Sequence, residues 1–414
     1  MVPDGWKRTT IGNVSKVTSG GTPSRSVPEY WNGEIPWVTT GLINFNVITK
    51  AVEYITKEGL ANSSAKMFPP KTLLVALYGD GVTRGKVAML GIDAATNQAC
   101  AAILPSNNVL PEYAFYYIAT NYEALRRESA DGNQKNLSGN LIKGYPLLLP
   151  PLPEQQKIAA ILSTWDRAIE LTEKLIAAKQ KRKQALMQQL LTGKVRFAEF
   201  VKSDETFSTR YGDYPADWQY IKIEKVASQV SEKNTDGTEH QVLSCTKYDG
   251  LVDSLTYFGK QIFSDDLSTY KIVRRNHFAY ATNHIEEGSI GYQNVCDVAV
   301  ISPMYTVFKT NQRIVDDGFL YKLLKSDLYV HIYQVNTSAS VDRRGSLRWT
   351  AFSHIRIPLP SLEEQRAIAA VLDGQQHEID LLSRKRETLQ QQKKGLMQQL
   401  LMGNIRVNMR DLDE

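Results

Sequence analysis

The chain has 414 residues, with 49 Lys and Arg against 44 Asp and Glu, a net charge of +5 and a pI near 8.8. Hydrophobic content of 42% with 22% charged residues excludes a largely disordered chain, and the length predicts two to four domains. The mild basicity permits a polyanionic partner without requiring one. Because the sequence shows no signal peptide or membrane-spanning run, and its three cysteines are scattered, we expect a soluble cytoplasmic protein.

Residues 1–150 are rich in short β-type runs broken by Gly and Pro, such as IPWVTT, TLLVALYG and KVAMLG. A helical run, EYAFYYIATNYEALRRE, follows Pro111. This mixture predicts one strand-rich α+β domain over 1–150. The segment GDGVTRGKV does not make a phosphate-binding loop, because Asp80 and Val87 stand where a glycine and a hydroxyl ligand of Mg²⁺ are needed.

A long helix is predicted within 151–196, because prolines precede it and Glu154 lies where the first turn favours an acidic residue. Apolar residues then recur in alternating steps of four and three, the spacing of a coiled-coil seam. The predicted seam residues are Ile158, Leu162, Trp165, Ile169, Ile176, Leu186 and Leu190. The basic cluster KQKRK at 179–183 is either a solvated face or a neighbour of nucleic acid or of an acidic partner. Gly193 stands where the helix would end.

Residues 197–214 have no hydrophobic period and many polar residues, so we interpret them as a linker. Residues 215–357 repeat the strand-rich mixture and end in the helical run GFLYKLLKSDLYVHIYQ. A second spacer helix and a C-terminal tail are predicted over 358–414. The seam of this helix comprises Ile368, Leu372, Ile379, Leu382, Leu389, Leu396 and Leu400.

The two helical segments are copies of one another. A shift of 210 residues places LPPLPEQQKIAAIL over LPSLEEQRAIAAVL and LMQQLLTGKVR over LMQQLLMGNIR, with 21 identities in 48 positions from Leu149 to Arg196. A weaker match lies upstream, where PDGWKRTTIGNV resembles PADWQYIKIEKV. The unit of about 200 residues is far longer than a solenoid repeat and indicates a duplicated domain pair. Because both helices share one seam grid, we expect them to pack together.

No catalytic constellation is visible in the sequence. It contains no nucleotide fingerprint after a strand, no HExxH motif and no histidines at metal-binding spacing. The acidic pairs Asp265-Asp266 and Glu286-Glu287 fit turns or surface charges better than a general acid–base pair. We therefore expect no catalytic residue, no metal and no cofactor in this chain, and two recognition bodies held by helices.

These motifs resemble the specificity subunit of type I restriction–modification systems, the HsdS family. The resemblance covers essentially the whole chain. It is carried by the P-L-x-E-Q-x-x-I-A-x-x-L motif over 151–162, which recurs over 361–372 with Ser361 replacing the proline, and by the two LMQQLL-x-G helix ends. The first body adds SGGTPSRSVPEYWNGEIPWVTT. The second lacks it and shows VLSCTKYDGL and RRGSLRW, which are familiar in other subsets of these domains.

The resemblance implies an α+β fold with two strand-rich target recognition domains and two long antiparallel helices that form a coiled coil between them. The internal repeat becomes a pseudo-twofold axis. Each domain is expected to read one half of a bipartite double-stranded DNA target. Two modification subunits, which methylate adenine, and ATP-dependent restriction subunits are the implied partners. S-adenosylmethionine, ATP and Mg²⁺ are expected on those subunits and not on this chain.

Polar loops supply the candidate DNA contacts, since phosphates are bound by cations, hydroxyls and backbone N–H groups while bases are read by side chains. In the first body they come from GGTPSR, YGDGVTRGK and GNQKN, and are Thr22, Ser24, Arg25, Tyr78, Thr83, Arg84, Lys86, Asn133, Gln134 and Lys135. In the second they come from SCTKY, ATNHIEEGS and SASVDRRGS, and are Ser244, Thr246, Lys247, Thr282, Asn283, His284, Ser340, Arg343 and Arg344. The three loops of one body are predicted to correspond, in order, to the three of the other.

Three alternatives remain open from the sequence. The same fold would serve a methylation-only complex or another multi-subunit defence system. A self-sufficient nuclease or methyltransferase is disfavoured by the missing motifs. A plain coiled-coil scaffold would show no sequence-selective DNA binding.

Overall fold

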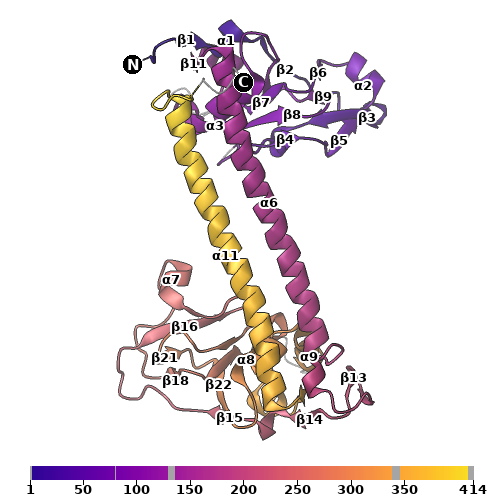
Figure 1. The fold of residues 1–414 in the computed structure, drawn as a ribbon, viewed down its shortest axis with the longest axis vertical. Helices are drawn as coiled ribbons and strands as arrows, with labels where there is room; N and C mark the ends of the chain where they lie inside the picture. The colour runs from indigo at the N-terminus through magenta and orange to yellow at the C-terminus, as the bar shows by residue number, and fades with distance from the viewer. Residues whose placement is uncertain (1, 80, 129–135, 338–345, 409–414) are drawn as a thin grey trace. The chain divides into compact units, whose positions relative to one another are not determined.

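The computed structural model describes residues 2–79, 81–128, 136–337 and 346–408 (Figure 1). It divides into two compact units, each combining parts distant in sequence. The first unit is Met1–Lys174 with Ser383–Glu414, and the second is Leu175–Leu382. Each unit therefore holds one strand-rich body, one end of the first long helix and the opposite end of the second.

The body of the first unit contains two sheets and a two-stranded ribbon. The ribbon pairs β1 (Lys7–Thr10) with β11 (Pro146–Leu149). One sheet has the order β2 (Val17–Ser19), β10 (Cys100–Ile103), β7 (Leu73–Ala76), β8 (Val87–Leu90) and β4 (Val47–Ile48). The other has the order β5 (Glu53–Ile55), β3 (Trp31–Val38), β9 (Ala94–Thr96) and β6 (Met67–Phe68). The helices are α1 (Ile11–Val14), α2 (Lys57–Ala61), α3 (Pro111–Thr120), α4 (Tyr122–Arg127) and α5 (Gly139–Gly144).

The body of the second unit repeats this plan. Its ribbon pairs β14 (Gln219–Lys222) with β23 (Arg356–Leu359). Its sheets have the orders β15 (Ala227–Val230), β22 (Tyr305–Thr310), β19 (Phe278–Ala281), β20 (Ile290–Tyr292), and β17 (Gly250–Asp253), β16 (Gln241–Thr246), β21 (Val298–Ile301), β18 (Lys271–Arg274). The helices are α7 (Ser254–Phe258), α8 (Asp317–Leu324), α9 (Asp327–Thr337) and α10 (Trp349–Phe352).

The two bodies share one topology despite their dissimilar sequences. The order β2-β10-β7-β8 matches β15-β22-β19-β20, and β5-β3-β9-β6 matches β17-β16-β21-β18. In both, the pair at the centre of the second sheet is parallel: β3 with β9, and β16 with β21. In the first body the strand β4 is added to the edge of the sheet, and the described residues of the second body form no equivalent strand. Matching strands identify which loops are truly equivalent.

The predicted linker over 197–214 carries secondary structure. Within it lie a 3₁₀ turn at Ala198–Phe200 and the strand β12 (Thr206–Thr209), which pairs with β13 (Gly212–Pro215). Tyr214 is buried at 2% exposure, and the rings of Phe207 and Tyr220 lie against it. Strands of four residues are too short to produce a visible hydrophobic period, so the sequence alone did not show this hairpin.

The two long helices are α6 (Leu152–Leu190) and α11 (Leu362–Leu401). Gly193 and Gly403 follow them with φ of +71°, and a Cβ at either position would collide with Pro215 or Pro3 respectively. Within each unit the helices run antiparallel, as the ion pair of Lys393 with Asp166 and that of Lys179 with Glu378 show. The α+β class, the two strand-rich bodies and the two long helices are therefore confirmed.

Every predicted seam residue is buried or half-buried. The ends of the seam, however, belong to the cores of the bodies. Ile158 and Leu162 pack with Leu400 in the core of the first body, and Ile368 and Leu372 pack with Leu190 in that of the second. The core of each body thus packs against the beginning of one long helix and the end of the other. Among the described helices, none has a stretch both long and apolar enough to cross a membrane.

Candidate nucleic-acid interface

A buried glutamate attaches each body to its helices. Glu154, 2% exposed, accepts a hydrogen bond of 2.9 Å from the indole of Trp6 and a bidentate pair of 2.7 and 2.9 Å from Arg406. Bidentate arginine–carboxylate pairs are strong and directional. The three partners come from the N-terminal segment, the start of α6 and the segment after α11. We call this set the first clamp.

The second clamp is its structural copy. Glu364, 1% exposed, accepts 3.1 Å from Trp218 and 2.8 and 2.9 Å from Arg196. Arg196 also pairs with Asp217 at 2.7 Å. The hydrogen bonds to Glu364 raise the pKa of Arg196, so its charge is permanent. The glutamate and the arginine of the clamp occur in both copies of the repeat because each body needs one such pair.

The glutamine after each glutamate fixes a turn of the body. Gln155 accepts a hydrogen bond from the backbone N–H of Leu110 at 2.8 Å and donates to the Pro150 carbonyl. Gln365 does the same with Asp316 at 2.8 Å and the Pro360 carbonyl. These bonds hold Leu110 and Asp316, the residues that cap the starts of α3 and α8. The glutamine of the E-Q motif therefore joins the start of each long helix to the backbone of its body.

In the first body the β2–β3 connection is held against neighbouring turns. The hydroxyl of Thr22 donates to Gln98 at 2.5 Å, and Ser24 bonds Ser26 at 2.8 Å. The guanidinium of Arg25 binds Glu53 at 2.6 and 3.1 Å and lies 3.7 Å from the centre of the Trp31 ring. The hydrogen bond from Arg25 lowers the pKa of Glu53. Arg25 thus remains half-exposed but is already paired within the domain.

The β7–β8 connection is braced from α4. Arg126 donates to the Gly81 carbonyl at 2.6 Å, and the hydroxyl of Tyr122 donates to the Val82 carbonyl at 2.5 Å. Tyr78 is 43% exposed, whereas Thr83, Arg84 and Lys86 are half-buried.

Phe45 lies beside this connection and was missed in the sequence. Lys86 donates to the Asn44 amide oxygen at 2.7 Å, and its ammonium is 5.9 Å from the Phe45 ring centre. Phe45 adopts a φ of +55° and is 39% exposed. A strained, exposed aromatic residue beside a lysine is a candidate DNA contact. The feature that marks Phe45 is its positive φ, which the sequence does not show.

In the second body Lys325, at the end of α8, joins two candidate loops. Its ammonium donates to the carbonyls of Lys247 at 2.6 Å and Gly288 at 2.8 Å, and more weakly to Thr246 at 3.5 Å. Burial lowers the pKa of Lys325. The lysine ties the β16–β17 turn to the β19–β20 connection. Nothing in the sequence KLLKSD distinguished it from a surface lysine.

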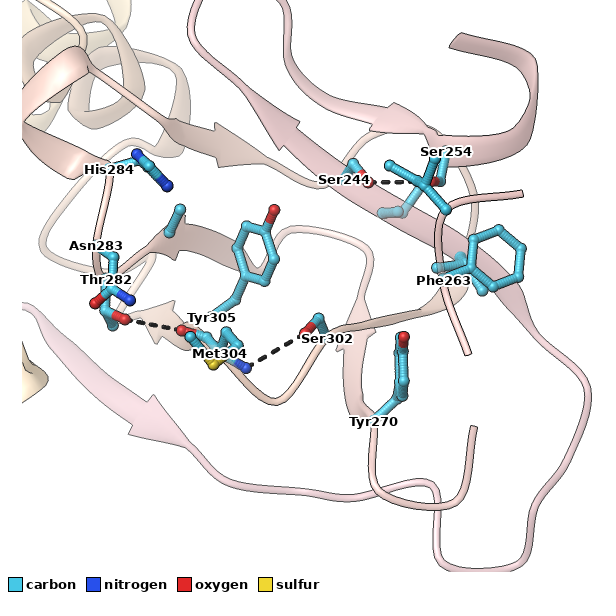
Figure 2. A pocket seen from close by; sticks show the side chains of 14 residues that line it. Ser244, Ser254, Phe263, Tyr270, Thr282, Asn283, His284, Ser302, Met304 and Tyr305 are labelled. Atoms are coloured by element: carbon cyan, nitrogen blue, oxygen red, sulfur yellow. Dashed lines mark hydrogen bonds between the residues drawn. The ribbon is translucent and has the colours of Figure 1, made fainter. Parts of the chain in front are cut away.

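Four of the predicted second-body residues surround one cavity of about 360 Å³ (Figure 2). Its lining consists of Val242, Leu243, Ser244, Ser254, Ile262, Phe263, Tyr270, Ala281, Thr282, Asn283, His284, Ser302, Met304 and Tyr305. Thr282 donates to the Met304 carbonyl at 2.9 Å, and Ser244 to Ser254 at 3.0 Å. Thr246 and Lys247 lie at the other end of β16, away from the cavity lining.

One predicted correspondence is wrong. The connection 20–30 joins β2 to β3, so its equivalent is 231–240, which joins β15 to β16. Ser244 and Thr246 instead lie in β16, the strand that matches β3, and Lys247 lies in the turn after it. Similar polarity had suggested an equivalence that the strand order does not support.

The second loops do correspond, because each joins matching strands, β7 to β8 and β19 to β20. Leu137 donates its backbone N–H to Leu77 at 3.0 Å, and Leu347 donates to Thr282 at 2.9 Å. In both bodies, therefore, the residue that follows the third candidate loop forms a backbone hydrogen bond with a residue near the start of the second candidate loop. The third-loop candidates Asn133, Gln134, Lys135, Ser340, Arg343 and Arg344 lie outside the described residues.

A possible metal-binding grouping appears once in the described part of the chain. His284, Glu286 and Glu287 place ligand atoms within 4.8 Å of one another. His284 lies 3.6 Å from Glu287 and is largely exposed, as is Glu287. Exposed carboxylates of this kind occur widely without an ion, so the grouping does not define a metal site.

Comparisons with known proteins agree with this architecture. The type I restriction modification DNA specificity domain family matches residues 3–179 and 210–391. The MjaVIII specificity subunit of a type I restriction enzyme from Methanocaldococcus jannaschii is 26% identical over 420 residues, covering 98% of this chain and 94% of that protein.

Two solved structures have the same fold. A chain from work on complex assembly and conformational transition of the type I restriction–modification system superposes with a TM-score of 0.60 at 16% identity, covering 98% of this chain and 100% of that one. The S subunit of the M. genitalium system gives 0.55 at 14% identity, covering 97% and 96%. The chain belongs to the type I restriction–modification DNA specificity family and is a specificity subunit with two target recognition domains.

Proposed function

We propose that the two bodies read the two halves of a bipartite double-stranded DNA target on behalf of a methylation and restriction complex. One observation carries the proposal: two bodies of the same topology present different loop residues at equivalent positions. A shared frame with divergent loops is what two different half-sites require, because direct readout depends on the side chains that reach the base edges. As a DNA-reading complex, it would work in the cytoplasm.

The DNA contacts of the first body are assigned to the connections around Thr22 and Tyr78. Lys86 and Arg84 supply cations for phosphates, whereas Tyr78 and Phe45 present exposed rings. Phosphate contacts set register and base contacts set sequence, so the two groups should differ in their effects. In the second body, Asn283 and His284 at the cavity and Lys247 on the β16–β17 turn are the corresponding candidates.

Two modification subunits are proposed to dock on the helices. Leu171 of α6 and Leu381 of α11 occupy equivalent positions of the repeat and are 55% and 50% exposed. Exposed leucines at matching positions of two copied helices suit two identical partners. Restriction subunits join that assembly. S-adenosylmethionine, ATP and Mg²⁺ are assigned to those partners, and no cofactor or metal to this chain.

The test is methylation by the chain co-expressed with its modification subunit, read by sequencing methylated adenines. We expect one bipartite motif. Tyr78→Ala and Phe45→Ala should relax base selectivity in only one half-site, and Asn283→Ala and Lys247→Ala only in the other. The phosphate-contact variants Arg84→Ala and Lys86→Ala should weaken methylation without changing the motif. Loss of both half-sites from a single loop variant, or methylation without sequence preference, would contradict the division of labour. A matched exposed lysine outside the loops, Lys309→Ala, should leave the motif unchanged.

A further inference from the structure

We propose that the cavity of the second recognition domain receives a nucleobase extruded from the DNA duplex. The inference rests on the proposed function, because the base would belong to the DNA that this domain reads. The cavity volume of about 360 Å³ lies within the range of specific ligand sites, roughly 300–1,000 Å³. Four residues chosen as DNA contacts from two separate sequence segments converge on it: Ser244, Thr282, Asn283 and His284.

The walls offer rings and apolar surface for the two faces of a base. The ring of Tyr305 projects between the segment of Thr282 and that of Ser244, and Phe263 and Tyr270 line the opposite side (Figure 2). Met304 and Ile262 also line the cavity, with exposures of 61% and 52%, so apolar side chains there are left in water. Extruded bases are held between aromatic and apolar side chains in this way, and such stacking tolerates any base.

The polar groups suit the hydrogen-bonding edge of a base. In the part of the chain that the structure describes, the amide of Asn283 forms no hydrogen bond, which leaves a donor pair and an acceptor for a ligand. The neighbouring groups are occupied: Thr282 donates to Met304, and Tyr270 accepts from the backbone of Ser264 at 3.2 Å. Amide side chains pair with adenine through one donor and one acceptor. Asn283 is therefore assigned the reading of the base edge.

The surroundings fit a nucleic-acid ligand better than a free small molecule. Lys271 donates to the backbone carbonyl of the cavity residue Tyr305, and Lys233 is the partner of Lys271 in an isolated β-bridge. This pair of cations favours a phosphate backbone nearby. The helix α7, which begins at the cavity residue Ser254, exposes Leu255 at 53% and Tyr257 at 50%. Apolar side chains of this kind can fill the gap that an extruded base leaves in the stack.

The experiment uses the complex of the full chain with its modification subunits. DNA duplexes carry 2-aminopurine at each position of the second half-site in turn, and fluorescence is measured on binding. We expect a rise at one position in addition to the adenine that is methylated. Met304→Trp, which fills the cavity from an exposed position, should abolish that rise even at protein concentrations that saturate the duplex, and should weaken DNA binding. Asn283→Ala should weaken DNA binding about tenfold, the cost of losing a two-bond contact to a base.

The matched control is Val295→Trp, because Val295 is also exposed, at 42%, but lies outside the cavity lining, in the connection between β20 and β21. It should leave both signals intact. If the complex binds and methylates its site but only the methylated adenine responds, the cavity does not hold a base and the inference is wrong. The inference is also wrong if free 2-aminopurine nucleoside binds the cavity while fluorescence rises at no position of the duplex other than the methylated adenine. Absence of any sequence-selective binding would instead contradict the proposed function itself.

Discussion

Lys393 on α11 forms an ion pair with Asp166 on α6, and its copy 210 residues earlier, Lys183, bonds Gln376, which stands in the place of Asp166. The same relation links the two clamps, since Arg406 with Glu154 becomes Arg196 with Glu364. Each half of the chain therefore carries both sides of the contacts that it makes with the other half. The pseudo-twofold character of the repeat is thus visible in individual bonds.

A fragment of residues 1–200 should form a symmetric dimer. By the repeat relation, Asp166 of one copy would meet Lys183 of the other, and Glu154 would meet Arg196. Without the second helix, the apolar stripe of α6 is exposed, and a twofold pairing closes it. Lys179 does not face its own copy in this register. Sedimentation should show a dimer at micromolar concentration, and with modification subunits the fragment should methylate a palindrome.

Charge reversal gives the control for that dimer. Asp166→Lys or Lys183→Asp alone should weaken the dimer, whereas the double variant should restore it because both exchanged charges meet again. A folded monomer of the unmodified fragment would contradict the pairing. Methylation of a non-palindromic site would contradict the symmetry.

The second clamp should contribute more stability than the first. In Glu364→Gln the arginine Arg196, whose side chain is 7% exposed, keeps only Asp217 as a carboxylate partner, so we expect a loss of about 2 kcal/mol. In Glu154→Gln the partner Arg406, 43% exposed, regains water, and a loss of about 1 kcal/mol is expected. Urea unfolding followed by tryptophan fluorescence measures both. The exposed pair of Glu378 with Lys179 provides the control, and equal losses in the two clamp variants would refute the ranking.

Lys325 should act as a positioning residue. In Lys325→Met the three carbonyls that it holds lose their donor, so the β16–β17 turn and the β19–β20 connection separate. We expect relaxed selectivity at the second half-site, unchanged selectivity at the first, and faster amide exchange in both loops. Lys309→Met controls for loss of charge. Unaltered selectivity with faster exchange would mean that these loops do not read DNA.

Arg343 and Arg344 remain predicted base contacts. If either makes a bidentate contact to guanine, its alanine variant should lose about 1–3 kcal/mol of binding and relax one base position. Lys179 and Lys183, by contrast, bond Glu378 and Gln376, so their variants should affect the helices and not base selectivity. The methylation motif measures both. An unchanged motif and affinity in both arginine variants would remove these residues from the site.

His277 should make the second unit more stable as pH rises. Burial lowers its pKa from the ordinary 6.5, and its Nδ1 accepts the backbone N–H of Arg274 at 3.3 Å. The unfolded chain therefore binds a proton more readily, so this stabilisation is complete above about pH 6.5 and is lost as pH falls toward the lowered pKa. His277→Asn keeps the acceptor but cannot titrate, and should flatten the pH dependence of the unfolding free energy between these values. An identical slope in both proteins would contradict the assignment.

The helices could be predicted because their signal extends over many turns. Ile158 and Leu162 stood on a regular grid, yet their place in the core of a body depends on residues such as Tyr113 that no period connects to them. The sheets could not be derived, since several strands have only two to four residues and pair with distant partners. The cavity and the role of Lys325 likewise arise only when β16, β19 and α8 come together. Polarity identified candidate loops but not their equivalence.

The contact of Pro3 with Gly403 repeats that of Pro215 with Gly193, but only the latter pair is joined through a short stretch of chain. The same joint is thus made once by continuous peptide and once by packing and the first clamp alone. This is the pattern expected when two separate copies of a shorter ancestor become fused. Fusion places the copies under separate mutation, so the two bodies are free to diverge. A symmetric ancestor could recognise only inverted repeats. After fusion, the protein can acquire an asymmetric DNA target while the proline–glycine contacts stay the same.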